Sequence, residues 1–309
     1  MAKIAFLGTP AVAVPVLRDL AATHAVTAVF ANPDRPQGRG RKLEAPPVKQ
    51  AALALGLPVH QPENWKVPET RALWEGLGID LAIVVAYGHI LPSWMLDACP
   101  TWNLHFSLLP RWRGAAPVNH AILQGDAETG VSLMRIVPGL DAGPVLAVSR
   151  RAIGLTDTAD GLLALLAEDA AGLLRAHLGH LLSGQVDPTP QDEALVTVAS
   201  KLDRTMSLLD FSRSALALHR QVRALHPWPG VELTMEGLRV KVCGVGGLRA
   251  SGDAPGTICW DRAGTWLTAG DGQALELTLL QRPGKPVQPA LQALQPWGVT
   301  GRQAVGGAL

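Results

Sequence analysis

The sequence predicts an α/β domain built on a mostly parallel sheet, followed by a smaller domain of β-strands. In the first part of the chain, short apolar runs alternate with helical patterns, which is typical of a parallel sheet covered by helices on both faces. From about residue 230, short strands follow one another with only Gly and Asp turns between them, which indicates a small antiparallel barrel or sandwich. With 309 residues the chain is long enough for two domains.

The elements of the first part follow from its periodicity. A short apolar strand over residues 3–7 ends in Gly8-Thr9-Pro10, and a helical pattern over residues 11–20 follows it, with Pro10 suited to open the first turn. The strongest strand candidate, IDLAIVVA, lies within residues 77–86. We also expect strands at 26–30, 131–137 and 145–151, and helices at 48–55, 93–98 and 160–182.

The change of character along the chain sets the expected domain boundaries. The stretch GQVDPTPQDE, residues 184–193, is polar and carries prolines, as linkers commonly do. We therefore place a first domain at residues 1–189, a linker at 190–206 and a second domain at 207–309. The strands expected in the second domain cover 231–234, 238–243, 256–260, 265–268 and 274–280.

Composition excludes several classes of protein. Charged residues make up 17% of the chain, and no apolar run approaches the roughly 20 residues that cross a bilayer. The start of the sequence, MAKIAFLGTP, is too short in apolar residues for a signal peptide, so we expect a cytoplasmic protein. Three cysteines without CxxC spacing predict neither disulfides nor a zinc site, and we expect no metal.

The charge is unevenly distributed, although the formal net charge is only +1. Residues 200–309 hold 12 basic and 8 acidic side chains, and residues 32–50 hold 5 basic and 2 acidic ones. The segment NPDRPQGRGRKLEAPPVK, residues 32–49, is too long and too rich in Gly and Pro for an ordinary βα connection. Its cluster of Arg39, Arg41 and Lys42 suits contact with nucleic-acid phosphates, and a solvated surface loop is the alternative.

A second unusual segment is WNLHFSLLPRWRGAAP, residues 102–117. Strand alternation places Asn103, His105 and Ser107 on one face, so that an amide and an imidazole converge on one small polar group. Asp141 follows the next long strand in the glycine turn PGLDAGP, and we expect the two strand-end turns to be neighbours. An acidic group that orients a histidine is a recurring acid–base device. A purely structural role, with His105 hydrogen-bonded at a strand end, is the open alternative.

These motifs resemble those of the folate-dependent formyltransferases. The segments NLHFSLLPRWRGAAP and GLDAGP stand at the distance usual in that family, and the resemblance extends over nearly the whole chain. It is closest to the members that act on initiator tRNA, through FLGTP, NPDRPQGRGRKLEAPPVK, VVAYGHILP, LLPRWRGAAPV, GDAETGVSLM and RALHPWPG. Two departures are Val12-Ala13, where an aromatic residue is common, and RTMSLLDF at 204–211, where the family carries more charge.

The resemblance implies a Rossmann-like catalytic domain and an OB-like, tRNA-binding C-terminal domain. It implies transfer of a formyl group from 10-formyltetrahydrofolate, the co-substrate, to the α-amino group of methionyl-initiator tRNA, by a monomer that works without a metal. Asn103, His105 and Asp141 would form the catalytic trio. Arg39, Arg41 and Lys42 would contact the acceptor end of the tRNA. The co-substrate would lie against the turn formed by Ser107, Leu108, Leu109 and Pro110.

Three alternatives remain at this point. A formyltransferase acting on glycinamide ribonucleotide shares the trio, but such enzymes typically lack the second domain and the arginine-rich loop. Formyltransferases acting on sugar nucleotides share the catalytic core, and some carry an OB-like extension. A non-catalytic RNA- or folate-binding relative is the third possibility, against which the presence of all three trio residues argues.

Overall fold

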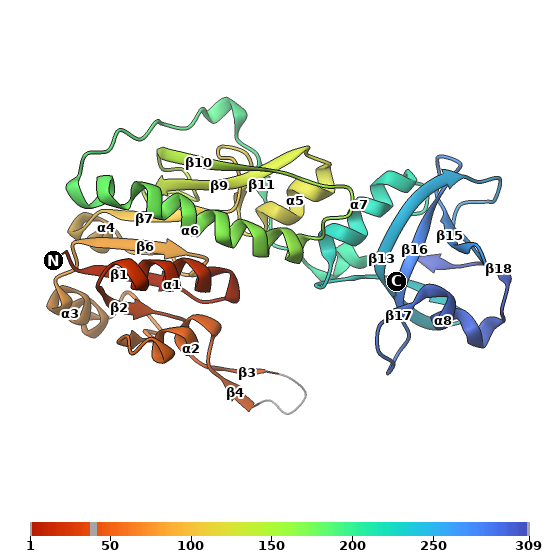
Figure 1. Cartoon of the computed structure of the whole chain (residues 1–309), viewed down its shortest axis with the longest axis horizontal. Coiled ribbons are helices and arrows are strands. Elements are labelled where there is room, and N and C mark those ends of the chain that lie inside the picture. The colour runs from red at the N-terminus through yellow and green to blue at the C-terminus, as the bar shows by residue number, and fades with distance from the viewer. Residues whose placement is uncertain (1, 38–41, 308–309) are drawn as a thin grey trace. The chain divides into compact units, whose positions relative to one another are not determined.

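The computed structural model describes residues 2–37 and 42–307, which divide into two compact units (Figure 1). Unit 1 contains Met1–Gly114, Thr129–Arg151 and Leu163–Val198, and unit 2 contains Ala115–Glu128, Ala152–Leu162 and Ala199–Leu309. These units are groups of residues in mutual contact. The boundaries of the domains expected at 1–189 and 207–309 stay a prediction.

Unit 1 is built on a seven-stranded, mostly parallel sheet, as the sequence predicts. β1 pairs in parallel with β2 on one side and β6 on the other, and β6 pairs in parallel with β7. β9 runs antiparallel to β7. The strands, in sheet order, are β10 (Val145–Ala152), β9 (Glu128–Arg135), β7 (Thr101–His105), β6 (Leu81–Val85), β1 (Ile4–Gly8), β2 (Val26–Phe30) and β5 (Val59–His60).

Helices flank this sheet. Along β1, Ala5 and Leu7 belong to a core that includes Trp74 of α3 and Met95 of α4. α1 and α6 are joined by Asp19 and Arg175, whose Nε lies 3.1 Å from the carboxylate. The helices are α1 (Val14–Thr23), α2 (Pro47–Ala54), α3 (Pro68–Leu77), α4 (Ser93–Ala98) and α6 (Ala159–Ser183), and four short strands are β3 (Arg35–Gln37), β4 (Lys42–Glu44), β8 (Arg113–Gly114) and β11 (Val198–Ala199).

Unit 2 is a nearly closed antiparallel barrel in which the long, curved β13 is a conspicuous strand (Figure 1). The inward side chains of its strands, together with α7 and α8, form one apolar core. In sheet order the strands are β18 (Gly301–Ala304), β14 (Thr257–Asp261), β15 (Gly264–Thr268), β16 (Gln273–Gln281), β13 (Leu238–Ala250), β12 (Val231–Met235) and β19 (Gly306–Gly307), with β17 (Gln288–Pro289) on β16. The helices are α5 (Pro117–Gln124), α7 (Ala215–Leu225) and α8 (Ala290–Leu294).

β13 is seven residues longer than the expected strand at 238–243, because glycines hide its continuation. The pairing with β16 shifts register near Gly244 and again before Leu248. A Cβ atom at Gly244 would lie 2.6 Å from Thr278 Oγ1, and one at Gly246 would lie 2.3 Å from Glu276 Oε2. Bulges of this kind bend a strand, and a side chain at either glycine would require Thr278 or Glu276 to shift.

Within unit 2, α7 holds two neighbouring segments by polar contacts. Arg223 Nη1 donates to the carbonyls of Gly154 and Asp157 at 3.0 and 2.8 Å, and its Nε donates to His219 Nδ1 at 3.2 Å. Asn119 of α5 donates to the Ala224 carbonyl at 2.6 Å. Burial, with the charge of Arg223, lowers the pKa of His219 to about 4, so the imidazole that accepts from Arg223 is neutral at physiological pH.

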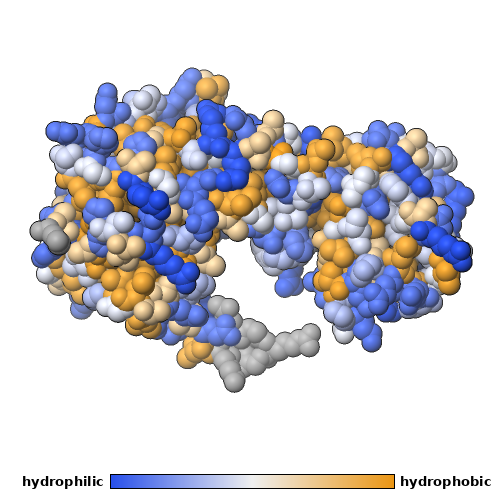
Figure 2. All heavy atoms as spheres, in the orientation of Figure 1, coloured by the Kyte–Doolittle hydropathy of each residue, from blue (hydrophilic) through white to orange (hydrophobic). Residues whose placement is uncertain are grey.

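Among residues 2–37 and 42–307, no helix is long and apolar enough to cross a membrane. On the face of each unit drawn in Figure 2, hydrophilic and hydrophobic side chains are interspersed.

Candidate active site

Strand β7 brings Asn103 and His105 to one face of the unit 1 sheet. Asn103 is aligned with Val84 of β6 and Met134 of β9, and His105 with Ser132 of β9. The Asn103 side chain is half-buried, whereas His105 is 6% exposed. Since the two residues are two apart on a strand, their side chains point the same way, as expected from the sequence.

Both ring nitrogens of His105 face oxygen acceptors. Nε2 lies 2.9 Å from the carbonyl of Trp112, and Nδ1 lies 3.6 Å from Asp141 Oδ2. A carbonyl oxygen accepts only, so Nε2 carries a proton. The ring is therefore fixed by the Trp112 carbonyl, with Nδ1 turned toward the Asp141 carboxylate.

Asp141 reaches His105 by a route that the sequence did not indicate. Because β9 is antiparallel to β7, its last residue, Arg135, is aligned with Trp102 near the start of β7. β9 therefore ends at the opposite edge of the sheet from β7, but the two turns are neighbours, as expected from the sequence. Residues 136–144 turn back instead, and the side chain of Asp141 is brought to His105 all the same.

The loop that carries Asp141 has a demanding backbone. Asp141 has φ +47°, in the left-handed region, which Asp tolerates better than most residues. A Cβ atom at Gly143 would lie 1.7 Å from the Arg135 carbonyl, so only glycine fits there. Asp141 Oδ2 accepts a 2.9 Å hydrogen bond from the Gly114 amide, which fixes the carboxylate in this conformation.

Gln191 and Arg113 hold the same loop from outside, and sequence reasoning missed both. Gln191 Nε2 donates to the carbonyls of Asp141 and Gly143 at 2.8 and 2.7 Å. Its Oε1 accepts from Arg113 Nε at 2.9 Å, and Arg113 Nη2 pairs with Glu193 at 2.7 Å. The hydrogen bonds to Arg113 lower the pKa of Glu193. The sequence gives little indication of this contact, because Gln191 and Glu193 lie in the polar stretch that we expect to be a linker.

The turn formed by Ser107–Pro110 is anchored on β9. Ser107 Oγ donates to the Arg111 carbonyl at 2.6 Å, and the residue is fully buried. Ser132 Oγ donates to the Ser107 carbonyl at 2.6 Å and accepts from the Leu109 amide at 3.0 Å. β7 ends at His105, so Ser107 lies beyond the strand and its hydroxyl serves the turn. Leu108, Leu109 and Pro110 are each half-buried.

The basic segment 32–49 contains a hairpin rather than a plain loop. β3 pairs antiparallel with β4, and Lys42 is the first residue of β4. Arg39 and Arg41 lie outside the described residues. At the base of the hairpin, Lys49 Nζ donates to both oxygens of Asp34 at 2.8 Å, which lowers the pKa of that carboxyl. In Figure 1 the hairpin extends away from the sheet of unit 1.

Comparison with known proteins divides the chain into an N-terminal and a C-terminal match. Residues 2–176 match the family model described as formyl transferase, and residues 201–296 match the model of its C-terminal domain. The chain belongs to the formyl transferase family. The N-terminal match contains β7, the Asp141 loop and the basic hairpin of this formyl transferase, whereas the C-terminal match contains α7 and β12–β17.

Curated relatives of this formyl transferase cover nearly its full length. A methionyl-tRNA formyltransferase from Stenotrophomonas maltophilia is 49% identical, over 91% of this chain and 93% of its own. One from Methylococcus capsulatus is 44% identical, over 97% and 99%. Among solved structures, an N-formyltransferase from Helicobacter canadensis, determined with folinic acid and dTDP-3-aminofucose, aligns with a TM-score of 0.68 at 17% identity, over 91% of this chain and all of its own. That likeness concerns the fold.

Proposed function

We propose that this formyl transferase moves a formyl group from 10-formyltetrahydrofolate to the α-amino group of methionine esterified to initiator tRNA, in the cytoplasm. The observation that carries the proposal is the pairing of His105 with Asp141, with Asn103 on the same face of β7, in a chain whose relatives, at 44–49% identity over nearly its full length, are named methionyl-tRNA formyltransferase. Relatives this similar over nearly the full length support a shared substrate, whereas the solved structure at 17% identity supports only a shared fold.

Asn103 is the side chain best suited to bind the developing oxyanion. Attack of the amine on the formyl carbon turns the carbonyl oxygen into an oxyanion, and donors already aimed at it lower the barrier by about 3 kcal/mol each. The Asn103 amide stands half-exposed on β7. His105, its neighbour on that face, would add a second N–H donor when its Nδ1 is protonated.

His105 presents its Nδ1 edge to the reaction. Its other nitrogen is committed to the Trp112 carbonyl at 2.9 Å, which fixes the ring. The Nδ1–Oδ2 distance of 3.6 Å to Asp141 is longer than a hydrogen bond, and such contacts often tighten only when substrate is bound. The Nδ1–H group is thus placed to donate to the oxyanion while it faces the carboxylate.

Asp141 would orient His105 and receive the proton that the attacking ammonium must lose. A carboxylate beside an imidazolium favours the charged ring, and its second oxygen is available for the amine, directly or through water. The Gly114 amide and the left-handed backbone keep Asp141 in place. The new C–N bond forms first, giving the oxyanion; as the oxyanion collapses, the bond from the formyl carbon to N10 breaks and N10 takes the proton held by Asp141, directly or through water. The formyl group thus passes between the two nitrogens without a covalent enzyme intermediate.

The turn Ser107–Pro110 fits the role of a support for the flat ring system of the folate. Leu108, Leu109 and Pro110 offer partly exposed apolar surface, and the hydrogen bonds to Ser132 hold the turn rigid. Arg39, Arg41 and Lys42 would contact phosphates at the acceptor end of the tRNA, from a hairpin anchored by Lys49 and Asp34. Fixing two large substrates together removes much of the entropic barrier.

A formylation assay with three acceptors tests the proposal. The purified chain is incubated with 10-formyltetrahydrofolate and, separately, with methionyl-initiator tRNA, glycinamide ribonucleotide or a dTDP-linked amino sugar. We expect N-formylmethionyl-tRNA to form and the two small acceptors to stay unmodified. Formylation of the amino sugar without turnover of the tRNA would contradict the proposed substrate while keeping the chemistry. Absence of turnover with every acceptor would contradict both.

A further inference from the structure

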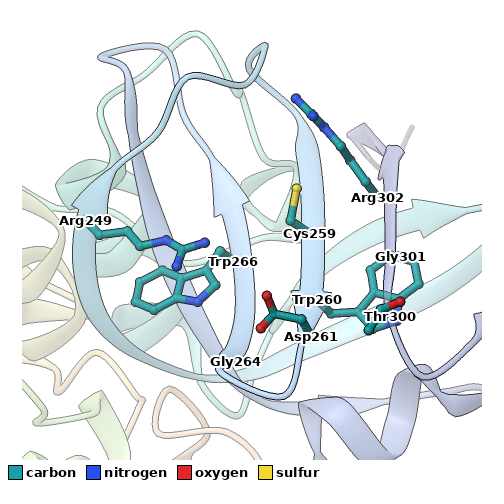
Figure 3. A pocket seen from close by; sticks show the side chains of 9 residues that line it. All are labelled: Arg249, Cys259, Trp260, Asp261, Gly264, Trp266, Thr300, Gly301 and Arg302. Carbon is teal, nitrogen blue, oxygen red and sulfur yellow. The ribbon is translucent and has the colours of Figure 1, made fainter.

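A hollow of about 380 Å³ lies on the outer face of the unit 2 barrel, away from the barrel core (Figure 3). β14, β15 and β18 form its floor, and Arg249 at the end of β13 closes one side. The aromatic ring of Trp266, two arginines and a carboxylate meet in this hollow. None of the proposed catalytic or folate-binding residues takes part in it.

The strand register places these side chains in one outward row. Cys259 of β14 is aligned with Trp266 of β15 on one side and with Arg302 of β18 on the other. Asp261 lies two residues after Cys259 and therefore on the same face. Ile258 and Trp260, which flank Cys259 in β14, are 0% and 4% exposed and belong to the core, so the row itself points out of the barrel.

Trp266 and Arg249 form a stacked pair. The Arg249 guanidinium lies 4.1 Å from the centre of the Trp266 ring, as Figure 3 shows. The indole lies close against Gly264, where a Cβ atom would come within 3.0 Å of Nε1 and where φ is +144°. A glycine at this turn thus lets the ring lie flat, and the backbone holds it there. The result is a planar surface of one indole and one guanidinium.

Such a surface matches the chemistry of a nucleobase. Unpaired bases stack on aromatic rings and on arginine planes, and OB-type barrels use this mode on their outer face. Asp261 Oδ1 accepts from the Ala263 amide at 2.7 Å, and its other oxygen is left to accept from an exocyclic amino group. Arg302, which also pairs with Asp253, supplies positive charge at the opposite rim for a phosphate.

We propose that this hollow binds one unpaired nucleotide of the tRNA, with its base stacked on the Trp266–Arg249 pair, its amino group on Asp261 and its phosphate near Arg302. Naming tRNA as the source rests on the proposed function. The site would read a base that protrudes from the folded RNA, and a continuous duplex would not enter it. The hollow would thus bind tRNA by base stacking, in addition to the phosphate contacts proposed for Arg39, Arg41 and Lys42.

The test measures RNA binding by fluorescence anisotropy with three ligands: uncharged initiator tRNA, a single-stranded ribotetranucleotide containing all four bases, and a blunt RNA duplex. Replacing Trp266 with Leu should weaken binding of tRNA and tetranucleotide about 5- to 150-fold, the range found for loss of one stacked base. Trp266→Phe should retain most of the affinity. Binding of the duplex should not change, and the salt dependence of tRNA binding should stay as in the wild type, because no phosphate contact is lost.

Arg249→Lys provides a second variant that cannot fail through misfolding, because Arg249 is exposed. It keeps the charge but loses the planar surface, and it should weaken tetranucleotide binding several-fold. The matched control is Arg239→Lys, ten residues earlier in the same strand, which should bind all three RNAs like the wild type. Equal affinities in Trp266→Leu and wild type, an equal loss with the duplex, or a loss confined to the tetranucleotide would each overturn the proposal.

Formylation by the wild type, measured in parallel, separates this proposal from the function. If the wild type formylates methionyl-tRNA, the function stands, and Trp266→Leu should raise KM for the tRNA while kcat at saturation stays the same. An unchanged KM would then count against the hollow alone. If the wild type does not formylate methionyl-tRNA, the function fails, and the tetranucleotide and duplex arms still decide whether the hollow binds a single-stranded nucleotide.

Discussion

His105 Nδ1 lies 3.6 Å from Asp141 Oδ2, and the two residues reach each other although their strands run in opposite directions. The same carboxylate oxygen accepts from the Gly114 amide at 2.9 Å. The carboxylate is therefore held by the backbone, independently of the imidazole. Loss of His105 would leave Asp141 in place, whereas loss of the Asp141 charge would leave His105 bonded only to the Trp112 carbonyl.

This relationship predicts that His105 and Asp141 act as one unit. His105→Ala, Asp141→Asn and Asn103→Ala should each lower kcat by roughly 10² or more without unfolding the chain. The double variant His105→Ala with Asp141→Asn should lose little more than either single variant, because each already removes the shared function. Single-turnover formylation measures this. A double variant that loses the product of the two single losses would show independent roles.

Gln191 is predicted to be a positioning residue for Asp141. A carboxylate at this place cannot donate to the Asp141 and Gly143 carbonyls, so Gln191→Glu should displace the loop and lower kcat by roughly 10- to 100-fold. KM for the folate should hardly change, since the Ser107–Pro110 turn does not depend on Gln191. Glu193→Gln is the control, because its pair with Arg113 is mostly solvent-exposed on the Glu193 side and should contribute little. Equal losses of kcat in both variants would contradict the role of Gln191.

The basic hairpin is predicted to bind tRNA and to take no part in the chemistry. Replacing Arg39, Arg41 and Lys42 with Ala should lower kcat/KM for methionyl-tRNA by up to several orders of ten, at about 1–3 kcal/mol per contact. It should also flatten the salt dependence by about one unit per lost phosphate contact. Arg39, between Gly38 and Gly40, should matter most among single variants.

Two measurements test whether the hairpin binds tRNA without taking part in the chemistry. Turnover is followed as a function of salt, with Lys66→Ala, an exposed lysine of the same unit, as the control. Folate affinity is measured separately and should be that of the wild type. An unchanged salt slope, or an equal loss of folate affinity, would show that the cluster does not contact tRNA.

His219 predicts a loss of stability in mild acid. Its folded-state pKa of about 4 lies below the ordinary value of 6.5, so between these values the unfolded chain takes up a proton that the folded chain does not. Stability from the neutral His219 is therefore complete above pH 6.5 and declines as pH falls to about 4. Urea unfolding at pH 7.5 and pH 5 should show wild type losing about 2 kcal/mol more than His219→Asn. A parallel decline in both proteins would rule out this source.

The sequence predicts the elements of the sheet well, because their signals are local. Apolar runs such as IDLAIVVA have few alternatives to a buried strand, and the helix at Ser93–Ala98 has the predicted bounds. Asn103 and His105 share a face for the same local reason. The direction of β9 depends on how the chain returns after β7, and no periodicity within β9 encodes that direction.

The sequence did not predict contacts between segments that lie far apart along the chain. Gln191 reaches the Asp141 carbonyl across 50 positions of sequence, from a stretch whose polar composition favoured a linker. α7 has apolar residues at Leu218, Val222 and Leu225 in helical spacing, although no helix was expected over residues 215–225. In β13, three glycines remove the alternation that marks a strand, and so the hollow beside Arg249 was not foreseen.

Each of the two units is made of three separate segments of the chain, and this limits where recombination could divide the gene without disrupting a unit. Unit 2 draws α5 and residues 152–162 from the middle of the chain, and Asn119 and Arg223 bond them to α7 and its neighbours. A single recombination crossover near residue 200 would therefore separate α5 from the helix that it contacts. An exchange of the C-terminal part would keep unit 2 intact only if the new part reproduced the surface of α7 that contacts α5 and residues 152–162.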